Sequence, residues 1–197
     1  MSRKAVSNKL LKACFVAIVL FVGPRSFGMV TIDFEGMPDM ALVTNQYAPL
    51  GVNFQGGIIL TAYSSLNVID FPPHSGSQVL GNKPFVISAD FSTPVSYVGA
   101  WFTYTTQVNL AAYDSSDLLI TSTWSLANNN YGTSEFISLS SISPISRLTI
   151  VDEGFGSVFI MDDFQFQPVA AVPAPGALLL GSIGMAIVSY VRRRNLL

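Results

Sequence analysis

Four carboxylates are the residues whose type and spacing best suit chemistry in this sequence. Asp33 and Glu35 lie in an early segment that alternates apolar and polar residues, and Asp162 and Asp163 lie side by side in a late segment of the same kind. Period-two alternation puts Asp162 on the apolar face of that late segment. An ionised carboxylate on an apolar face is costly unless it is paired or bound to a metal, so Asp162 needs a partner.

A calcium ion is one partner that would satisfy these carboxylates. Lys83 and Arg147 are the only basic residues between residues 29 and 171, so salt-bridge partners are scarce. If the first and last strands lie side by side, Asp33 and Glu35 approach the Asp162–Asp163 pair and the four side chains offer oxygen ligands for a structural Ca²⁺. The alternative is a strand end at which Asp162 accepts hydrogen bonds from backbone amides. The sequence leaves both interpretations open.

The single histidine, His74, is predicted to be a loop residue. It stands beside Ser75, just after two consecutive prolines. A Ser-His-Asp hydrolase needs three residues in a defined geometry, and one histidine beside a serine is a weak sign of it. The sequence also contains no nucleophile elbow, zinc-ligand spacing or phosphate-binding loop, and the spacing of its acids singles out no glycosidase pair. We therefore expect no catalytic residue.

Four aromatic residues form a candidate platform for a sugar ring: Trp101, Tyr104, Trp124 and Tyr131. They lie in or near predicted strands, and sugar rings stack on exposed aromatic faces. Trp101 and Phe102 are neighbours, so one of the two points inward whichever face is wet. Because large aromatic residues also dominate cores, we expect at least half of the four to be buried.

The middle of the chain, residues 29–168, is predicted to be an all-β, antiparallel jelly-roll β-sandwich. Apolar residues recur at every second position in short runs, and no convincing amphipathic helix is found. Turn-forming residues separate the runs and predict roughly eight to eleven short strands. The alternating runs include 30–35, 50–54, 85–91, 108–112 and 158–166, and the turn signals are 36–39, 56–57, 71–76, 93–94, 114–117, 128–132, 143–144 and 153–157.

The middle region is strongly acidic. It holds all twelve acidic residues of the chain and two of its ten basic residues, so its net charge is about −10 although the whole chain carries −2. Such a domain will not bind nucleic acid or anionic lipid by counterion release. The charge suits cation binding or a neutral polysaccharide surface better.

Residues 1–28 are predicted to be a secretory signal peptide. A basic N-terminal segment without acids precedes the apolar run 13–22, which is too short to span a bilayer. Small residues at Ser26 and Gly28 favour cleavage after Gly28. The only cysteine, Cys14, leaves with this segment, so the mature domain depends on its core and not on disulfides.

The C-terminal end carries a second targeting signal. Residues 169–175 form a linker with a Pro-Ala-Pro motif, and residues 176–197 are predicted to form a membrane helix that ends in an Arg cluster. The uncharged run 176–191 would span ~24 Å as a helix, short for a hydrocarbon core of ~30 Å. Positive charge stays cytoplasmic, so the preceding domain lies outside. A plain anchor and a processed sorting signal both fit. The signal residues are Val172, Pro173, Ala174, Pro175, Gly176, Arg192, Arg193 and Arg194.

This order of motif, short apolar helix and Arg cluster resembles the PEP-CTERM sorting signal of Gram-negative bacteria, over about 26 of the 197 residues. The resemblance implies recognition by exosortase, a membrane transpeptidase. It also implies a transient stay in the inner membrane and delivery to the cell surface or the exopolysaccharide matrix. The tripeptide here is Pro173-Ala174-Pro175, so the Glu of the family's name is missing, which leaves the exosortase variant open.

Six short segments of the middle region carry a second resemblance. They are 31–35 (Thr-Ile-Asp-Phe-Glu), 47–54 (Tyr-x-x-x-Gly-Val-x-Phe), 75–80, 90–95, 112–114 and 160–166. Their order resembles a β-sandwich common in PEP-CTERM proteins, and the first and last of them resemble strands of carbohydrate-binding-module jelly rolls.

Two hypotheses about function follow. In the first, signal peptidase and exosortase process the chain, and the domain has a non-catalytic structural or adhesive role at the surface or in the matrix. In the second, the delivered domain is a carbohydrate-binding module for exopolysaccharide, with a structural calcium site. An enzyme has no positive support in the sequence. An exposed aromatic strip on one sheet face would distinguish the second hypothesis from the first.

Overall fold

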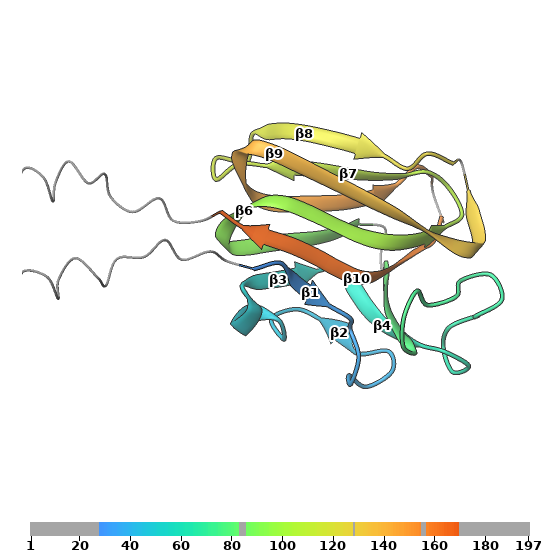
Figure 1. Cartoon of the computed structure of the whole chain (residues 1–197). Helices are drawn as coiled ribbons and strands as arrows, with labels where there is room; N and C mark the ends of the chain where they lie inside the picture. The colour runs from blue at the N-terminus through green and yellow to red at the C-terminus, as the bar shows by residue number, and fades with distance from the viewer. Residues whose placement is uncertain (1–27, 83–85, 128, 155–156, 170–197) are drawn as a thin grey trace, which may run out of the picture. The chain divides into compact units, whose positions relative to one another are not determined.

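The structure is a computed structural model that describes residues 28–82, 86–127, 129–154 and 157–169. These residues belong to one compact unit, Phe27–Val169. Its named strands all pair antiparallel (Figure 1). The elements are β1 (Val30–Ile32), β2 (Leu42–Val43), the 3-10 helix η1 (Ala48–Leu50), β3 (Val52–Gln55), β4 (Gly57–Thr61), β5 (Gln78–Asn82), β6 (Val86–Tyr104), β7 (Val108–Tyr113), β8 (Leu119–Trp124), β9 (Asn130–Asp152) and β10 (Phe159–Pro168).

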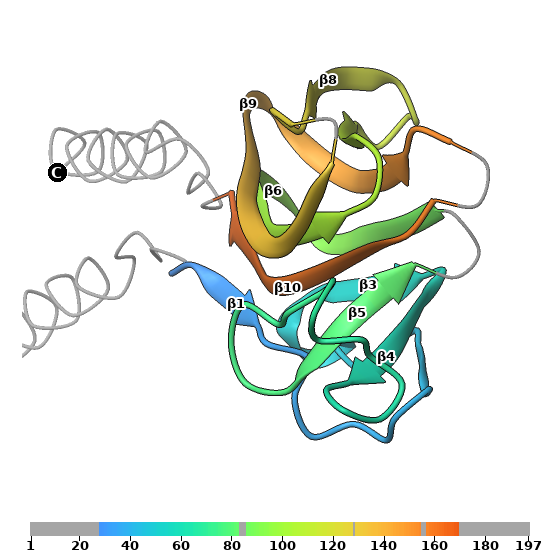
Figure 2. The ribbon, with the colours of Figure 1, turned by 90° about the vertical axis from the view of Figure 1, so that its right-hand side faces the viewer.

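Two long strands, β6 and β9, bend and take part in two layers. The first half of β6, Val86–Asp90, pairs with Arg147–Val151 of β9, and its second half, Tyr97–Phe102, pairs with Glu135–Ser140. The two halves of each long strand pair with different further strands. One layer has the order β3, β6, β9, β7, β8, and the other has the order β2, β4, β5, β10, β6, β9, with β1 beside β10. The strong bend of β9 is visible in Figure 2.

Pro94 and Pro144 lie close to this bend. The prediction that residues 93–94 and 143–144 form turns is wrong, because both pairs lie inside the long strands, next to the Val95–Ile145 pair where the register shifts. Proline has no N–H for the ladder, so within a sheet it suits places where pairing is interrupted. These residues mark a change of layer and not a reversal of the chain.

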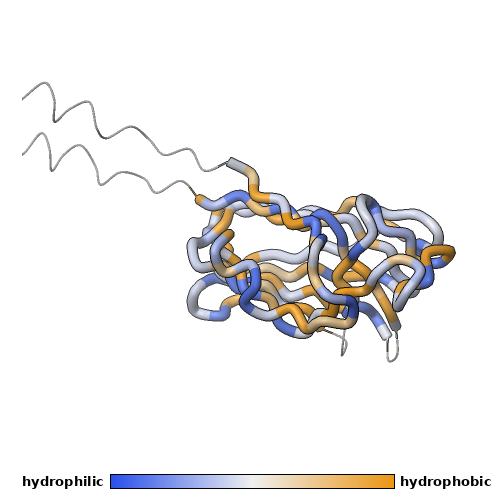
Figure 3. The backbone as a smooth tube through the Cα atoms, turned by 90° about the horizontal axis from the view of Figure 1, so that it is seen from below, coloured by the Kyte–Doolittle hydropathy of each residue, from blue (hydrophilic) through white to orange (hydrophobic). Residues whose placement is uncertain are grey.

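The main core fills the space between the two layers. Phe54 of β3 and Phe164 of β10 belong to different layers, and their ring centroids lie 5.3 Å apart; Phe91 and Phe166 repeat this contact at 5.3 Å. Buried and more exposed residues alternate along strands such as β3 and the first half of β6, as expected for sheets with one face in a core. Hydrophobic and hydrophilic stretches are correspondingly interspersed along the chain in Figure 3. The all-β antiparallel prediction is therefore confirmed, and the layers define a β-sandwich with a core of its own.

A smaller apolar cluster lies outside this core. Residues 62–77, which connect β4 to β5 and are called the outer loop below, contribute Leu66 to it. Val79 of β5 and Ile160 of β10 complete the buried set, and Phe71 of the outer loop packs against it. The outer loop therefore covers part of the outer face of the second layer.

An extra residue in β10 explains why its side chains change face. Asp162 pairs with Trp101 and Gln165 pairs with Gly99, so three steps along β10 match two steps along β6. Asp163 adopts the left-handed conformation with φ of 46° at this bulge. Strict alternation therefore fails at this point.

The bulge corrects the predicted faces of β10. Phe159 and Met161 share the main core with Phe164, although alternation placed them on opposite faces. Asp162 is only 2% exposed, so its predicted burial is confirmed. Because it lies two positions after Ile160 and before the bulge, it faces the outer loop and not the main core.

The predicted targeting segments lie outside the described residues, except for Gly28 at the end of the signal peptide and Val169 at the start of the linker. Within the part of the chain that is described, no helix has the length and apolar character needed to cross a membrane.

Candidate functional site

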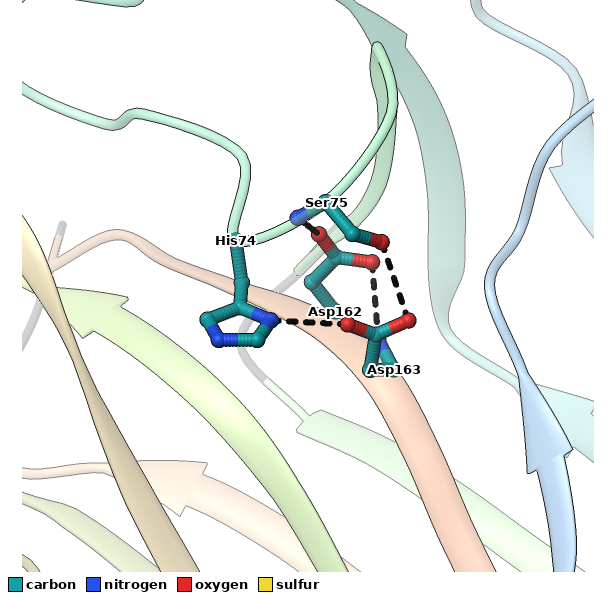
Figure 4. A network of polar contacts seen from close by, with 4 residues as sticks. All are labelled: His74, Ser75, Asp162 and Asp163. Atoms are coloured by element: carbon teal, nitrogen blue, oxygen red, sulfur yellow. Dashed lines mark hydrogen bonds and ion pairs between the residues drawn. The ribbon is translucent and has the colours of Figure 1, made fainter.

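A polar cluster forms where the outer loop meets the bulge of β10 (Figure 4). The backbone N–H of Ser75 donates to Asp162 Oδ2 at 2.8 Å, and the Ser75 hydroxyl donates to Asp163 Oδ1 at 3.0 Å. His74 Nδ1 lies 2.7 Å from Asp163 Oδ2, and the N–H of Asp163 donates to Asp162 Oδ1 at 2.7 Å. The two adjacent carboxylates thus fix two consecutive loop residues.

Burial raises the pKa of Asp162 to about 6, and the negative charge of Asp163 adds to this effect, while the hydrogen bond from Ser75 opposes it. The sequence left open whether a metal or backbone amides would satisfy Asp162. In the structure both of its oxygens accept backbone N–H groups. The backbone-amide interpretation therefore describes Asp162.

Ser75, His74 and Asp163 meet, but not in the order of a hydrolase triad. In a triad the histidine lies between the serine and the aspartate and takes the serine proton. Here Asp163 lies between the other two, accepting the Ser75 hydroxyl on one oxygen and facing His74 with the other. This arrangement holds the loop and does not activate Ser75 as a nucleophile.

An aromatic surface continues from this cluster across the outer face of the second layer. The rings of His74 and Trp101 stack with centroids 3.9 Å apart and planes 7° from parallel. Trp101 also contacts Phe136 at 5.2 Å between centroids. We call His74, Trp101 and Phe136 the outer aromatic cluster. A methyl group on Gly99 would lie 2.8 Å from the Phe136 ring and 2.9 Å from the Tyr97 hydroxyl, so glycine lets these side chains lie over the strand.

The four aromatic residues predicted as a sugar platform do not form one surface. Tyr104 is fully buried in the main core and donates its hydroxyl to Glu135, so its predicted place in an exposed platform is wrong. Burial, with the contact to Glu135, raises the pKa of Tyr104. Trp124 ends β8 in the first layer and is 48% exposed, and Tyr131 is 51% exposed. Trp101 is half-buried beneath His74.

Tyr131 does lie near the outer loop, although not in the outer aromatic cluster. Its ring packs against Phe71 with centroids 5.9 Å apart, and the following Gly132 donates its N–H to the Asp70 carbonyl at 2.9 Å. The start of β9 is therefore attached to the outer loop. Of the predicted aromatic set, Trp101 and Tyr131 both border this loop, whereas Trp124 lies elsewhere.

The predicted pairing of the first and last strands is confirmed, since Ile32 of β1 pairs with Phe164 of β10. The four carboxylates are nevertheless divided. Asp33 Oδ1 accepts the N–H of Glu35, and Glu35 Oε1 accepts the N–H groups of Ser77 and Gln78 at 2.6 and 2.7 Å. Glu35 therefore holds the end of the outer loop.

The predicted four-carboxylate calcium site is not assembled in this structure. Across residues 28–169, apart from the few positions not described, no group of three or more His, Cys, Asp or Glu side chains is placed to hold a metal ion. The physical reason is that each pair of acids already accepts protein N–H groups: Asp33 and Glu35 on one side, Asp162 and Asp163 on the other.

Sequence reasoning missed three residues that hold this region together. Gln78 is 7% exposed, and its amide both accepts from Met37 N–H and donates to the Met37 carbonyl. Asp39 accepts the hydroxyl groups of Ser64 and Ser65, and these hydrogen bonds lower its pKa. Ser75 is the third. The cluster of Ser residues in the outer loop was the available signal, because Ser and Asp side chains often bond loop backbone.

The predicted sorting residues Val172, Pro173, Ala174, Pro175, Gly176, Arg192, Arg193 and Arg194 lie outside the described residues. Their role stays a prediction.

Comparisons with known proteins give a general likeness only. No protein-family model matches the chain, and no curated protein matches it. Among solved structures, the K2 cleaved adhesin domain of Lys-gingipain matches with a TM-score of 0.48 and 11% identity, over 71% of this chain and 99% of that one.

TmCBM61 in complex with beta-1,4-galactotriose matches with a TM-score of 0.41 and 13% identity, over 68% of this chain and 100% of that one. A family 29 carbohydrate binding module matches with a TM-score of 0.42 and 10% identity, over 71% and 87% of the two chains. At these TM-scores the likenesses carry no argument, and the description of the sandwich rests on its own strand pairing.

Proposed function

We propose that this chain is an exported, non-catalytic β-sandwich protein with a structural or adhesive role at the bacterial surface or in the extracellular matrix. Signal peptidase removes residues 1–28, and exosortase recognises the tail from Val172 onward during a transient stay in the inner membrane. The ordered series of Pro-Ala-Pro motif, short apolar run and Arg cluster is the observation that carries this proposal.

The geometry of the sandwich supports a role that needs no chemistry. Among the described residues, the buried core runs from Ile32 to Phe166 and lies within one compact unit, which supports a domain that acts after both ends are removed. The one cluster that contains Ser, His and Asp together holds a loop and lacks the order of a catalytic triad. The net charge of about −10 keeps such a domain soluble in a matrix of neutral polymer.

Substitution in the tail tests this proposal. In the native host, Pro173→Ala with Pro175→Ala should leave the protein in the membrane fraction at its unprocessed mass, while the wild type reaches the outside. Ala174→Ser is the matched control, because it changes the same motif without removing a proline. Equal release of the double variant and the wild type would contradict recognition of the motif by exosortase.

Carbohydrate binding, on a jelly-roll module, is the second candidate function. The outer aromatic cluster favours it, because it presents aromatic surface on a sheet face next to polar groups of Asp163 and Ser75. Sugar rings need both an aromatic face and hydrogen-bonding groups. A structural calcium ion is no longer needed for this proposal, since the four acids bond to protein donors.

Retention of the purified sandwich on the host exopolysaccharide tests this second function. We expect Trp101→Ala to reduce retention at least tenfold and the exposed Trp124→Ala to leave it unchanged. No retention of the wild type on the host polymer or on a glycan array would exclude the carbohydrate function and leave the structural role in place.

A further inference from the structure

Strand β8 forms an open edge of the sandwich. It is the last strand in the order of the sheet, and among the described strands it pairs only with β7. In Figures 1 and 2 it lies along the top margin of the domain, and no described segment runs above it. An open edge leaves backbone N–H and C=O groups available for another strand.

The register shows which backbone groups of β8 point outward. Ser125 N–H donates to the Val108 carbonyl at 2.9 Å, and Leu110 pairs with Thr123. In an antiparallel ladder, hydrogen-bonded pairs alternate with pairs whose N–H and C=O groups point away. Ser122 and Trp124 therefore direct their backbone N–H and C=O groups away from β7, toward the open side.

The sequence of β8 has none of the features that usually prevent an edge strand from pairing with another chain. Natural edge strands are usually short, charged, interrupted by proline or covered. Strand β8 has six residues with no charge and no proline. By contrast, β2 at the other end of the order has only two residues, and β3, an edge of the first layer, is partly covered where Phe54 N–H donates to the Thr44 carbonyl at 2.7 Å.

Charge points to a second copy of this chain as the partner. The domain carries a net charge of about −10, but residues 118–134 contain no charged residue. Two copies can therefore approach along this stretch with the least repulsion. The stretch is also apolar at the surface, with exposed fractions of 68% for Leu118, 53% for Leu119, 48% for Trp124 and 92% for Leu126.

We propose that two copies of this chain associate through β8, antiparallel and related by a two-fold axis at Ser122. In this register, residues whose backbone N–H and C=O groups point away from β7, such as Ser122, lie opposite residues of the second copy that do the same. The hydrogen bonds of an antiparallel ladder can then form between the two copies. It places Thr121 opposite the partner's Thr123, and these residues lie on one face because they pair with Ala112 and Leu110 of β7. Hydroxyl pairs of this kind favour strand pairing. The two first layers then form one continuous sheet.

Sedimentation of the isolated sandwich, residues 29–169, tests the association, because these residues lie in one compact unit with a buried core. We expect a reversible monomer–dimer equilibrium for the wild type. Ser122→Pro should weaken it at least tenfold, because proline removes the outward N–H, and it should fold normally, because that N–H does not bond β7. Ser122→Ala keeps the N–H and should dimerise like the wild type. Thermal melting confirms that each variant is folded.

Cross-linking tests the two-fold position of Ser122. Residues 29–169 contain no cysteine, so Ser122→Cys introduces the only thiol, and we expect mild oxidation to give a disulfide-linked dimer. Ser140→Cys, at an exposed position of β9, should stay monomeric. A wild type that is monomeric at all concentrations would overturn the proposal. So would a dimer that survives Ser122→Pro, or equal cross-linking of both cysteine variants.

Discussion

The main core and the outer-loop region hold the same sandwich by different means. The main core consists of apolar side chains from both layers, such as Phe54 and Phe164, which contact at 5.3 Å. The outer loop packs Leu66 into a small apolar cluster with Val79 and Ile160. Carboxylates also hold it, with Glu35 at its end and Asp162 beneath Ser75. We conclude that the core sets the stability, whereas the carboxylates set the position of the loop and make it depend on pH.

Removing one aromatic ring from each region should give the largest difference between the two regions in the free energy of unfolding. Phe164→Ala leaves a cavity among three other phenylalanine rings and should lower the free energy of unfolding by about 3–5 kcal/mol. Phe71→Ala in the outer loop should cost about half of that, because Phe71 is only partly buried. Urea unfolding measures both. Equal losses of unfolding free energy would contradict the distinction between the main core and the smaller apolar cluster under the outer loop.

The second-largest effect should come from the pH dependence of Asp162. The pKa of Asp162 is raised from 3.8 to about 6 in the folded state, so its proton favours the folded state. Its contribution is full below pH 3.8 and is lost as the pH rises through about 6, by up to about 3 kcal/mol. The wild type minus Asp162→Asn difference in unfolding free energy should fall by most of this amount between pH 4 and 7.

The exposed acid Glu153, substituted as Glu153→Gln, is the control for general charge effects. If Asp162→Asn behaves like this control, Asp162 does not have the raised pKa.

Loss of the Glu35 carboxylate should loosen the loop more than the fold. Glu35→Ala removes the acceptor for the N–H groups of Ser77 and Gln78 and should cost about 1–2 kcal/mol. We expect faster proteolysis within residues 62–77, with cleavage sites elsewhere unchanged. Ser138→Ala, on an exposed strand position, serves as the control. Uniformly increased cleavage would show that Glu35 supports the whole sandwich.

The smallest effect should come from His74. His74→Ala uncovers one face of Trp101 and removes the contact with Asp163. It should change the unfolding free energy by less than about 1 kcal/mol, because polar pairs at the surface contribute little. In a Trp124→Phe background Trp101 is the only tryptophan, and its emission should shift to longer wavelength. An unchanged spectrum would contradict the stacked arrangement.

The strand content and the pairing of the first and last strands could be predicted because alternation and turn chemistry are local properties of a sequence. The bulge in β10 could not be predicted, because no residue pattern in Ile160–Phe164 indicates that Asp163 adopts a φ of 46°. One inserted residue then exchanges the faces of everything before it. Pro94 and Pro144 predict turns but lie inside the bent strands β6 and β9. Proline is common both in turns and at bends of strands, so the sequence does not distinguish the two.

The site was predicted only in part, for the same reason. Burial of Asp162 followed from its apolar neighbours, and Trp101 was identified by residue type. The stack of His74 on Trp101 joins residues far apart in sequence, and the contact between them depends on how the outer loop folds. Long-range contacts of loops leave no periodic signal in a sequence.

The intact mass of the protein recovered from each fraction of the native host shows whether the tail is removed on export. We expect an extracellular product that begins near Met29 and ends near Val172, so that the sandwich is the whole delivered object. A product in the membrane fraction that retains the tail through Leu197 would contradict exosortase sorting and make the tail a plain anchor.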